Sequence, residues 1–299
     1  MITRNFCDII DFMKGLFIDN EYLCGEKYSA IFTEFEKAFS ALGVSLKRKS
    51  NADVWKLISE DKLEKYDFVL FWDKDIRLAE MLENRSYKVF NSSGTIAVCD
   101  DKGATYSSLY GKVVMPVTLV APFTYENVGY TNYDFLLTAE KTLGYPMVVK
   151  ESHGSFGKQV YLVKNRGELE RKVKEIGAKP FIMQEFVSSS FGTDVRAQVV
   201  GDRVVAFVKR KGADGSFVSN ASSGGSMEKY DADKEFEKLA IKSAKLVGAD
   251  FAGVDILFGK DGEPILCEIN SNAHFVNLKN ATGVNTAEHI AKYITEKIK

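Results

Sequence analysis

Polar side chains recur through the second half of the chain in an order that suits phosphate chemistry. They are cations, glycines, amides and carboxylates: Lys150, Gly154-Ser155-Phe156-Gly157, Gln184-Glu185, Asp194 with Arg196, and Asp255 with Glu268-Ile269-Asn270. Ammonium groups and loop amides bind phosphate oxygens, and hard carboxylate oxygens suit magnesium. Each segment is a weak signal by itself. In this order they predict a site for a nucleoside triphosphate with magnesium, and they fit metal-hydrolase or thiol chemistry less well.

Two carboxylates and an amide are expected to form the metal site. Asp255 and Glu268 lie on the two strands of an expected hairpin, and Asn270 follows Glu268 by two residues, so it shares its face. In a simple register all three side chains point the same way and offer magnesium oxygen ligands. The alternative is a set of surface carboxylates at strand ends. Apolar neighbours such as Val254 and Ile269 place the set inside a buried sheet and favour the metal site.

A lysine and a glycine loop are the candidates for phosphate contact. Lys150 ends the apolar strand Met147-Val148-Val149, where it can neutralise α- or β-phosphate oxygens; a lysine extending into solvent from a strand end is the alternative. Gly154-Ser155-Phe156-Gly157 joins two strands in the manner of a lid whose N–H groups reach phosphate. An ordinary hairpin explains the same glycines.

Further polar residues are candidates for the base, the ribose and the substrate. Gln184-Glu185 ends an apolar strand and suits adenine and ribose, with an exposed strand end as the alternative. Asp194 and Arg196 alternate on a strand and share a face, as an exposed cross-strand ion pair also would. Arg196 and Arg210 have the charge to stabilise a transferred phosphoryl group or a tetrahedral centre. Asn220, in a Gly/Ser-rich stretch, suits a substrate carboxylate or serves as a turn residue.

The first third of the chain is expected to alternate strands and helices. The basic cluster Lys47-Arg48-Lys49 is interpreted as a solvated loop. This β-α-β order indicates a small parallel sheet. Apolar runs and helical spacing predict strands at 15–18, 66–72 and 88–90 and helices at 30–42 and 76–83.

The rest of the chain is expected to position the polar residues on sheets. Pro116 limits the first strand to an edge or a strand start, and Gly201-Asp202 is a hairpin turn. The stretch 212–226 is expected to be a loop. The expected strands are 113–120, 146–150, 159–163, 181–187, 195–200, 203–209, 253–258 and 264–269, and the expected helices are 133–143, 235–247 and 286 onward.

Composition narrows the class of protein. The chain has 299 residues, 45% of them hydrophobic and 27% charged, which is typical of a globular protein with one large or two smaller domains. A formal net charge of -1 offers no field for nucleic acid. No run approaches the roughly 18 apolar residues of a membrane helix, and no secretory segment is recognised at the N-terminus. Neither nucleic acid nor membrane is therefore expected as a partner, and the cytoplasm is the expected location.

The cysteines and histidines suggest no thiol or triad chemistry. The four cysteines show no Cys-x-x-Cys pairing, which argues against a zinc site or a disulfide framework and for a reducing compartment. Cys267, in an apolar stretch, is interpreted as a small buried residue. None of the three histidines has a nucleophile at a suggestive spacing.

Taken together, these motifs resemble the ATP-grasp superfamily and, within it, the RimK-like carboxylate-amine ligases of the ribosomal-protein glutamate ligase type. The resemblance covers roughly residues 90–299. Its most specific stretches are Asp101-Lys102, Tyr145 to Lys150, Gln184-Glu185-Phe186, Gly192 to Arg196, Ser219-Asn220 with Gly224-Gly225, and Gly253-Val254-Asp255 through Cys267-Glu268-Ile269-Asn270.

The resemblance implies an α/β fold with α+β character. Two α+β subdomains would clamp ATP, and a small parallel α/β domain would precede them. The implied divisions are 1–98 for the preceding domain, 99–188 for the central and lid subdomain, and 189–299 for the C-terminal subdomain with the metal site.

The same resemblance implies a role for each matching residue. Lys102 and Lys150 would contact ATP phosphates, and Arg196 and Arg210 would face an acyl phosphate and a substrate carboxylate. The adenine and ribose would be held by Gln184, Glu185 and Val187. Two magnesium ions, or manganese in their place, would be bound by Asp255, Glu268 and Asn270. The other implied nucleotide-site residues are Ser155, Phe156, Gly157, Asp194 and Asn220.

The implied reaction has two steps. A carboxylate attacks the γ-phosphate to give an acyl phosphate and ADP, and an amine then attacks the acyl carbon and expels phosphate. The implied partners are ATP, a carboxylate and an amine, either small molecules or peptides, and a homo-oligomer is left open. The chain departs from the family at Ser271-Asn272-Ala273-His274-Phe275, where a Ser-Pro-Gly type segment often follows, so glutamate is not assumed as the added amino acid.

Two other classes of function stay open at this point. One is a regulatory or scaffold protein that binds nucleotide on an ATP-grasp fold without turnover, against which the complete metal triad and the arginines argue. The other is an unrelated α/β binding protein, which would show no magnesium-dependent affinity for nucleotides.

Overall fold

The computed structural model describes residues 13–154, 157–219 and 224–299. The chain divides into two compact units. The first runs to Phe90 and takes in Ala287–Lys299, and the second comprises Asn91–Thr286. All candidate site residues that the structure describes belong to the second unit.

The first unit contains a four-stranded parallel sheet in the order β2-β1-β3-β4. One of its inner strands is buried over residues 15–18, with Leu16, Phe17 and Ile18 at most 1% exposed, as its apolar run predicts. The expected parallel sheet is therefore present. Its elements are β1 (Lys14–Asp19), α1 (Glu26–Ser40), β2 (Ser45–Ser50), α2 (Asn51–Ser59), β3 (Phe68–Phe71), α3 (Ile76–Glu83), β4 (Val89–Phe90) and most of α10 (Thr286–Ile298).

The loop expected at Lys47-Arg48-Lys49 is instead the centre of β2, so that expectation was wrong. β2 pairs with β1 alone and lies at the edge of the sheet. An edge strand presents much of its surface to water, so charged residues are common there and hide the strand from a hydrophobicity pattern. Arg48 also forms an ion pair with Asp19 at 2.6 Å, at the end of the neighbouring strand.

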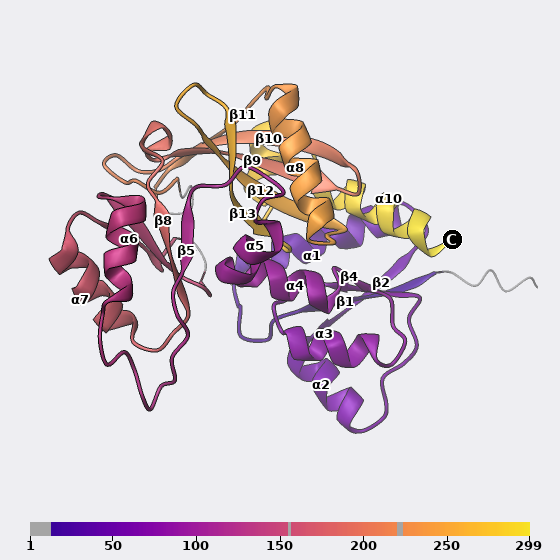
Figure 1. Ribbon diagram of the computed structural model, residues 1–299. Helices are drawn as coiled ribbons and strands as arrows, with labels where there is room; N and C mark the ends of the chain where they lie inside the picture. Colours follow the sequence, from indigo (N-terminus) through magenta and orange to yellow (C-terminus); the bar gives the residue numbers. More distant parts are fainter. Residues whose placement is uncertain (1–12, 155–156, 220–223) are drawn as a thin grey trace, which may run out of the picture. The chain divides into compact units, whose positions relative to one another are not determined.

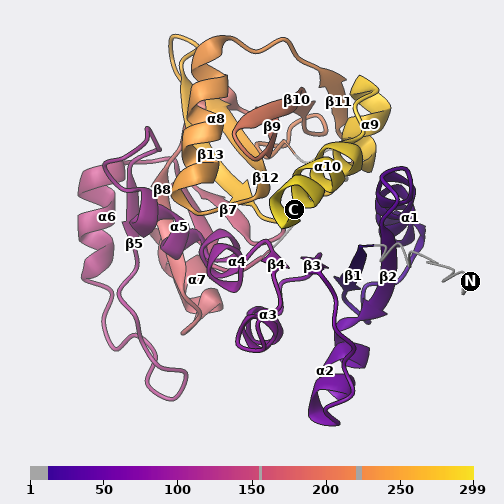
Figure 2. The same cartoon turned by 90° about the vertical axis from the view of Figure 1, so that its right-hand side faces the viewer.

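The larger sheet of the second unit has five antiparallel strands in the order β11-β10-β9-β12-β13. These are β9 (Thr193–Val200), β10 (Arg203–Lys211), β11 (Ser226–Lys229), β12 (Phe251–Phe258) and β13 (Pro264–Asn270). Helix α8 (Lys234–Leu246) packs on one face, and Figure 2 shows it lying across β12 and β13. The helices α4 (Ser93–Asp100) and α5 (Lys102–Leu109) contribute to the same core. On the opposite face, α9 (Val276–Thr282) packs against β10.

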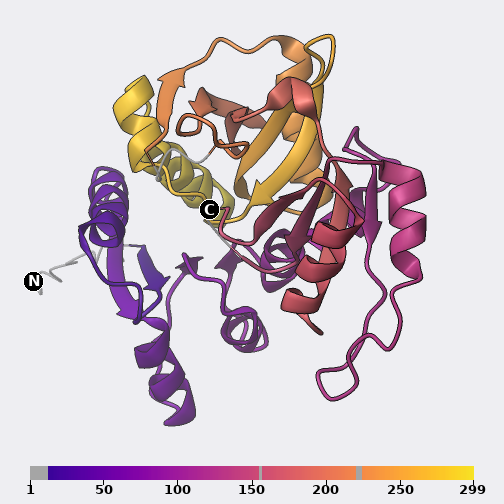
Figure 3. The ribbon, with the colours of Figure 1, turned by 90° about the vertical axis from the view of Figure 1, so that its left-hand side faces the viewer.

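The second sheet of this unit has the order β5-β8-β6-β7 and is also antiparallel. Its strands are β5 (Thr118–Val120), β6 (Met147–Glu151), β7 (Val160–Val163) and β8 (Phe181–Glu185), and β5 is an edge strand, as Pro116 predicts. The helices α6 (Phe135–Leu143) and α7 (Arg166–Ile176) both cover one face, which Figure 3 shows from the side of these helices. Because side chains alternate along a strand, Lys150 and Gln184 lie on the other face.

A buried asparagine fixes the beginning of the second unit. The Asn91 side chain is 1% exposed and donates to the carbonyl oxygens of Phe251 (2.9 Å) and Ser271 (2.8 Å). Its oxygen accepts from the Asp250 amide at 2.7 Å. These bonds tie the segment before α4 to β12 and to the residues after β13.

A helix that spans a membrane must be both long and apolar. Within residues 13–154, 157–219 and 224–299, no helix meets both conditions.

Candidate active site

One face of the five-stranded sheet collects most of the expected site residues. On β9, Val195 and Ala197 point into the core beneath α8, so the alternating Asp194 and Arg196 point to the other face. The register then places Asp255 on β12 beside Arg196, Glu268 on β13 beside Asp255, and Arg210 on β10 opposite Asp194. Asn270 shares the face of Glu268. Strand register therefore brings these six side chains together, although the first and the last of them, Asp194 and Asn270, are 76 residues apart in the sequence.

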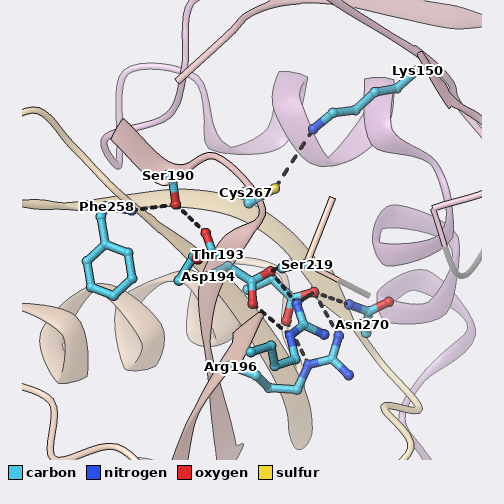
Figure 4. A network of polar contacts seen from close by, with 11 residues as sticks. Lys150, Ser190, Thr193, Asp194, Arg196, Ser219, Phe258, Cys267 and Asn270 are labelled. Carbon is cyan, nitrogen blue, oxygen red and sulfur yellow. Dashed lines mark hydrogen bonds and ion pairs between the residues drawn. The ribbon is translucent and has the colours of Figure 1, made fainter. Parts of the chain in front are cut away.

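Two arginines and two aspartates form a buried network on this face (Figure 4). Arg196 holds both oxygens of Asp255, with Nε–Oδ1 and Nη2–Oδ2 distances of 2.7 Å. Arg210 holds both oxygens of Asp194, one of them at 2.7 Å from Nε, and its Nη2 also lies 3.0 Å from Asp255 Oδ2. The Ser219 hydroxyl donates to Asp194. Since the two aspartates are only 4% and 5% exposed, these are buried pairs and not the surface pair that was the alternative.

The opposite charges in the network offset the cost of burying each ionised group. Burial raises the pKa of Asp255, but Arg196 and Arg210 outweigh it and hold that pKa below its usual value. Burial also raises the pKa of Asp194, and the guanidinium of Arg210 opposes this only in part. Burial lowers the pKa of Arg210, whereas Asp255 and Asp194 raise it by more. The arginines therefore keep Asp255 ionised, which is the form that a hard metal ion requires.

Two lysines lie beside β13, the edge strand that carries Glu268 and Asn270. Lys102, the first residue of α5, has its Nζ 3.8 Å from Glu268 Oε1 and 3.5 Å from the Gly154 carbonyl oxygen. Lys150 on β6 is 9% exposed, and its Nζ lies 3.8 Å from Cys267 Sγ on β13. The lysines thus connect the second sheet and the glycine loop with the strand that carries Glu268.

The nucleotide residues expected on β8 lie at one end of the second sheet. Gln184 is buried and donates to Thr118 Oγ1 at 2.8 Å, whereas Glu185 is exposed and accepts from the Val117 amide at 3.1 Å. Val187 lies two residues after Glu185 and directly precedes the short helix η1 (Ser188–Ser190). Gly157 adopts a φ of +70°, which favours glycine. The remaining expected residues, Ser155, Phe156 and Asn220, lie outside the described residues.

The donor set at Asp255 suits magnesium, but its oxygens already have partners. Asp255, Glu268 and Asn270 offer two carboxylates and an amide oxygen, which are hard ligands. Asp255 is engaged by Arg196 and Arg210, and Asn270 Nδ2 lies 3.4 Å from its Oδ2. No group of three or more Asp, Glu, His or Cys residues converges as a metal site within the described part of the chain, and the expected set, with two carboxylates and an amide, does not reach that number. The residues fit the ion provided that a guanidinium releases Asp255.

Sequence reasoning missed Cys267 as a site residue. The pairs Asp255–Glu268 and Ile256–Leu266 leave Cys267 without a partner, so β13 carries a bulge at this residue. Leu266 lies in the core, and Cys267 therefore faces the site together with Glu268. Burial raises the pKa of the Cys267 thiol, with Lys150 opposing. A bulge depends on the pairing of two strands, and the alternation of one strand gives no signal for it.

Known proteins share both the sequence pattern and the fold. The model of the RimK-like ATP-grasp domain matches residues 128–294. Beta-citrylglutamate synthase B of Danio rerio is 32% identical over 74% of this chain and 54% of its own length. Human N-acetylaspartylglutamate synthase A is 32% identical over 74% of this chain and 56% of its own. The chain thus spans about half the length of these curated relatives. An uncharacterized protein of Mycoplasma genitalium is 30% identical, over 76% of this chain and 79% of its own length.

Solved structures support the same fold. A RimK domain ATP-grasp protein of Sphaerobacter thermophilus superposes with a TM-score of 0.69 at 20% identity, over 94% of this chain and 98% of that one. The D-alanine–D-alanine ligase of Bacillus anthracis gives 0.71 at 16% identity, over 96% and 97%. At these identities the likeness concerns the fold alone. The match of the domain model across more than half of the chain, on the ATP-grasp fold, shows that the protein belongs to the RimK-like ATP-grasp family.

Proposed function

We propose that this protein is an ATP-dependent, ADP-forming ligase that joins a carboxylate to an amine through an acyl phosphate. The observation that carries the proposal is the single face formed by β10, β9, β12 and β13. It bears the oxygen ligands Asp255, Glu268 and Asn270 and the cations Arg196 and Arg210, and two lysines lie at its edge. Such a face suits a reaction in which two anions, a phosphate and a carboxylate, must approach each other.

Each part of the face has a role in this proposal. Lys102 and Lys150 bind phosphate oxygens, and both are directed to the β13 strand that carries Glu268. The exposed Glu185 carboxylate accepts from the ribose, while buried Gln184 and half-buried Val187 shape the adenine side. The other proposed nucleotide-site residues are Gly157, Asp194 and three that lie outside the described part of the chain, Ser155, Phe156 and Asn220.

Asp255, Glu268 and Asn270 would hold two magnesium ions, or manganese. When bound, these ions lower the repulsion between the γ-phosphate and the attacking carboxylate. Asp255 has both oxygens on Arg196 in this structure. A bound metal cation would repel the guanidinium of Arg196, so we expect Arg196 to leave at least one of these oxygens. Once released, Arg196 is free to pair with the acyl phosphate or the substrate carboxylate, while Arg210 stays with Asp194.

The substrate class is proposed as an amino acid, serving as the amine, and a peptide or small-molecule carboxylate. The support is the pair of curated relatives named as synthases of β-citrylglutamate and N-acetylaspartylglutamate. Both names describe an amino acid joined to a small acid. The segment 271–275 differs from the Ser-Pro-Gly type pattern of the family, so the proposal leaves open which amino acid is used.

The first test is a thermal shift with ADP or a non-hydrolysable ATP analogue, with and without magnesium. A ligand that binds only the folded state raises Tm, by linkage. We expect a magnesium-dependent rise in the wild type, and its loss in Asp255→Asn and Glu268→Gln. Glu228→Gln makes the same chemical change at an exposed position of β11 and should keep the rise.

Release of ADP in the presence of paired acids and amines then tests turnover. Nucleotide binding without ADP release over a broad panel would favour a regulatory nucleotide-binding protein. Absence of any magnesium-dependent shift in the wild type would refute the nucleotide site itself.

A further inference from the structure

The bulge on β13 adds one side chain to the site face and leaves the flanking core residues on the core face. Leu266 and Ile269 on either side of it are in the core, at 1% and 0% exposure. A strand with this core pattern but without Cys267 would still point Glu268 and Asn270 to the site face, because side chains alternate with a period of two. The extra residue is therefore not needed to orient the metal motif. Its effect is to present the Cys267 thiol beside Glu268.

That thiol lies against a buried ammonium group without a counterion. Lys150 is nine-tenths buried, and its Nζ is 3.8 Å from Cys267 Sγ. Among the described residues, no carboxylate lies within ion-pair distance of this ammonium. A buried, unpaired cation is costly unless an anion is to be bound there. A neutral sulfur acceptor orients the ammonium without neutralising it, whereas a carboxylate at the same position would compete with an incoming phosphate.

We propose that Cys267 is a positioning residue for nucleotide binding: its sulfur holds the Lys150 ammonium in place for a phosphate oxygen and leaves its charge uncompensated. This rests on the proposed nucleotide site and adds to it a residue that acts only through Lys150. Cys267→Ser keeps a hydrogen-bond acceptor at this position, and Cys267→Val keeps a side chain of similar volume without one. The two variants therefore separate orientation from packing.

The test is calorimetric titration with ADP at one magnesium concentration, held the same for every variant so that metal coordination contributes equally to each. We expect Cys267→Val to weaken ADP binding about three- to tenfold, the fold-change that matches the net worth of one hydrogen bond. Cys267→Ser should restore most of the affinity. In a Lys150→Met background, Cys267→Val should have no further effect, since the group that it positions is gone. Cys99→Val, at a buried cysteine of the core beneath the sheet, should leave ADP affinity unchanged.

Several results would overturn the inference. Equal losses in the valine and serine variants, or a loss that persists in the Lys150→Met background, would show that Cys267 acts by packing alone. Cys267→Ala serves if the valine variant does not fold. If the wild type does not bind ADP at all, the proposed nucleotide site is wrong and this inference is wrong with it. Titration of the wild type distinguishes this outcome from a failure of the inference alone.

Discussion

Replacing Arg210 by methionine tests whether the buried network is held by its charges. Arg210 is the only described residue that contacts both buried aspartates through its side chain, since it bonds Asp194 and lies 3.0 Å from Asp255. In Arg210→Met, Asp255 keeps its two bonds to Arg196, whereas Asp194 keeps the Ser219 hydroxyl alone. Methionine retains most of the volume, so the expected damage is electrostatic and concentrated on Asp194.

The expected loss follows from the burial of that carboxylate. Removing one partner of a buried ion pair costs about 3–5 kcal/mol, because the other charge stays buried without compensation. In a unit the size of Asn91–Thr286, this corresponds to a fall in Tm of roughly 6–20 °C. Adding Asp194→Asn removes the orphaned charge, so the double variant should regain at least about 2 kcal/mol of the free energy of unfolding.

Urea unfolding of the nucleotide-free protein, followed by circular dichroism, measures these differences. Arg203→Met makes the same change at an exposed position on the same strand and should stay within about 0.5 kcal/mol of the wild type. A loss below about 1 kcal/mol in Arg210→Met would be that of a surface pair and would refute the reasoning. So would an Asp194→Asn change that fails to rescue the variant.

Three further perturbations probe other parts of the chain. A methyl group on Gly253 would lie 2.4 Å from the Cβ of Ala273, so Gly253→Ala should cost about 1–3 kcal/mol in urea unfolding. Adding Ala273→Gly removes the clashing methyl group and should recover part of this loss. A double variant whose loss is the sum of the two single losses would contradict the clash. Asn91→Ala should lose about 3 kcal/mol or more because it strands several buried backbone groups; a loss under 1 kcal/mol in the same assay would argue against the bonds. Burial raises the pKa of Asp73, so the folded state binds its proton more tightly than the unfolded state. The contribution of Asp73 to stability should then decrease as pH rises above about 4, and Asp73→Asn should remove this decrease. A wild type and an Asp73→Asn variant whose free energies of unfolding change in parallel above that pH would refute it.

The sequence predicted the elements with a strong apolar pattern and the faces of most site residues. The buried strand at β3, the helix at α3 and the β9–β10 hairpin follow from runs and turns that are local in the chain. The faces of Asp194 and Glu268 follow from alternation beside core residues. What could not be predicted depends on pairing between strands. The charged edge strand β2 has no apolar signature, and the partners of the arginines are set by a register between strands far apart in sequence.

The same limit applies to Cys267 and to the partner of Asp194. The apolar neighbours of Cys267 indicated a core residue. The bulge that turns its side chain to the site face exists only once β13 pairs with β12, so the sequence of β13 alone gives no sign of it. Asp194 and Arg196 share a face, as alternation predicts, yet they do not bond each other. Each instead pairs across to the neighbouring strand, Asp194 with Arg210 and Arg196 with Asp255.

The bonds of Asn91 also have a consequence for the order in which the protein is completed during synthesis. Asn91 bonds the carbonyl oxygen of Ser271, 180 residues later in the chain. At about 5–20 residues per second, a ribosome needs about 9–36 s to make that stretch. Throughout this interval the segment before α4 lacks the partner that it has in the finished fold. The site face cannot be completed at this end before β13 and Ser271 have been made, so a nascent chain reaches its binding-competent form only after that point of synthesis.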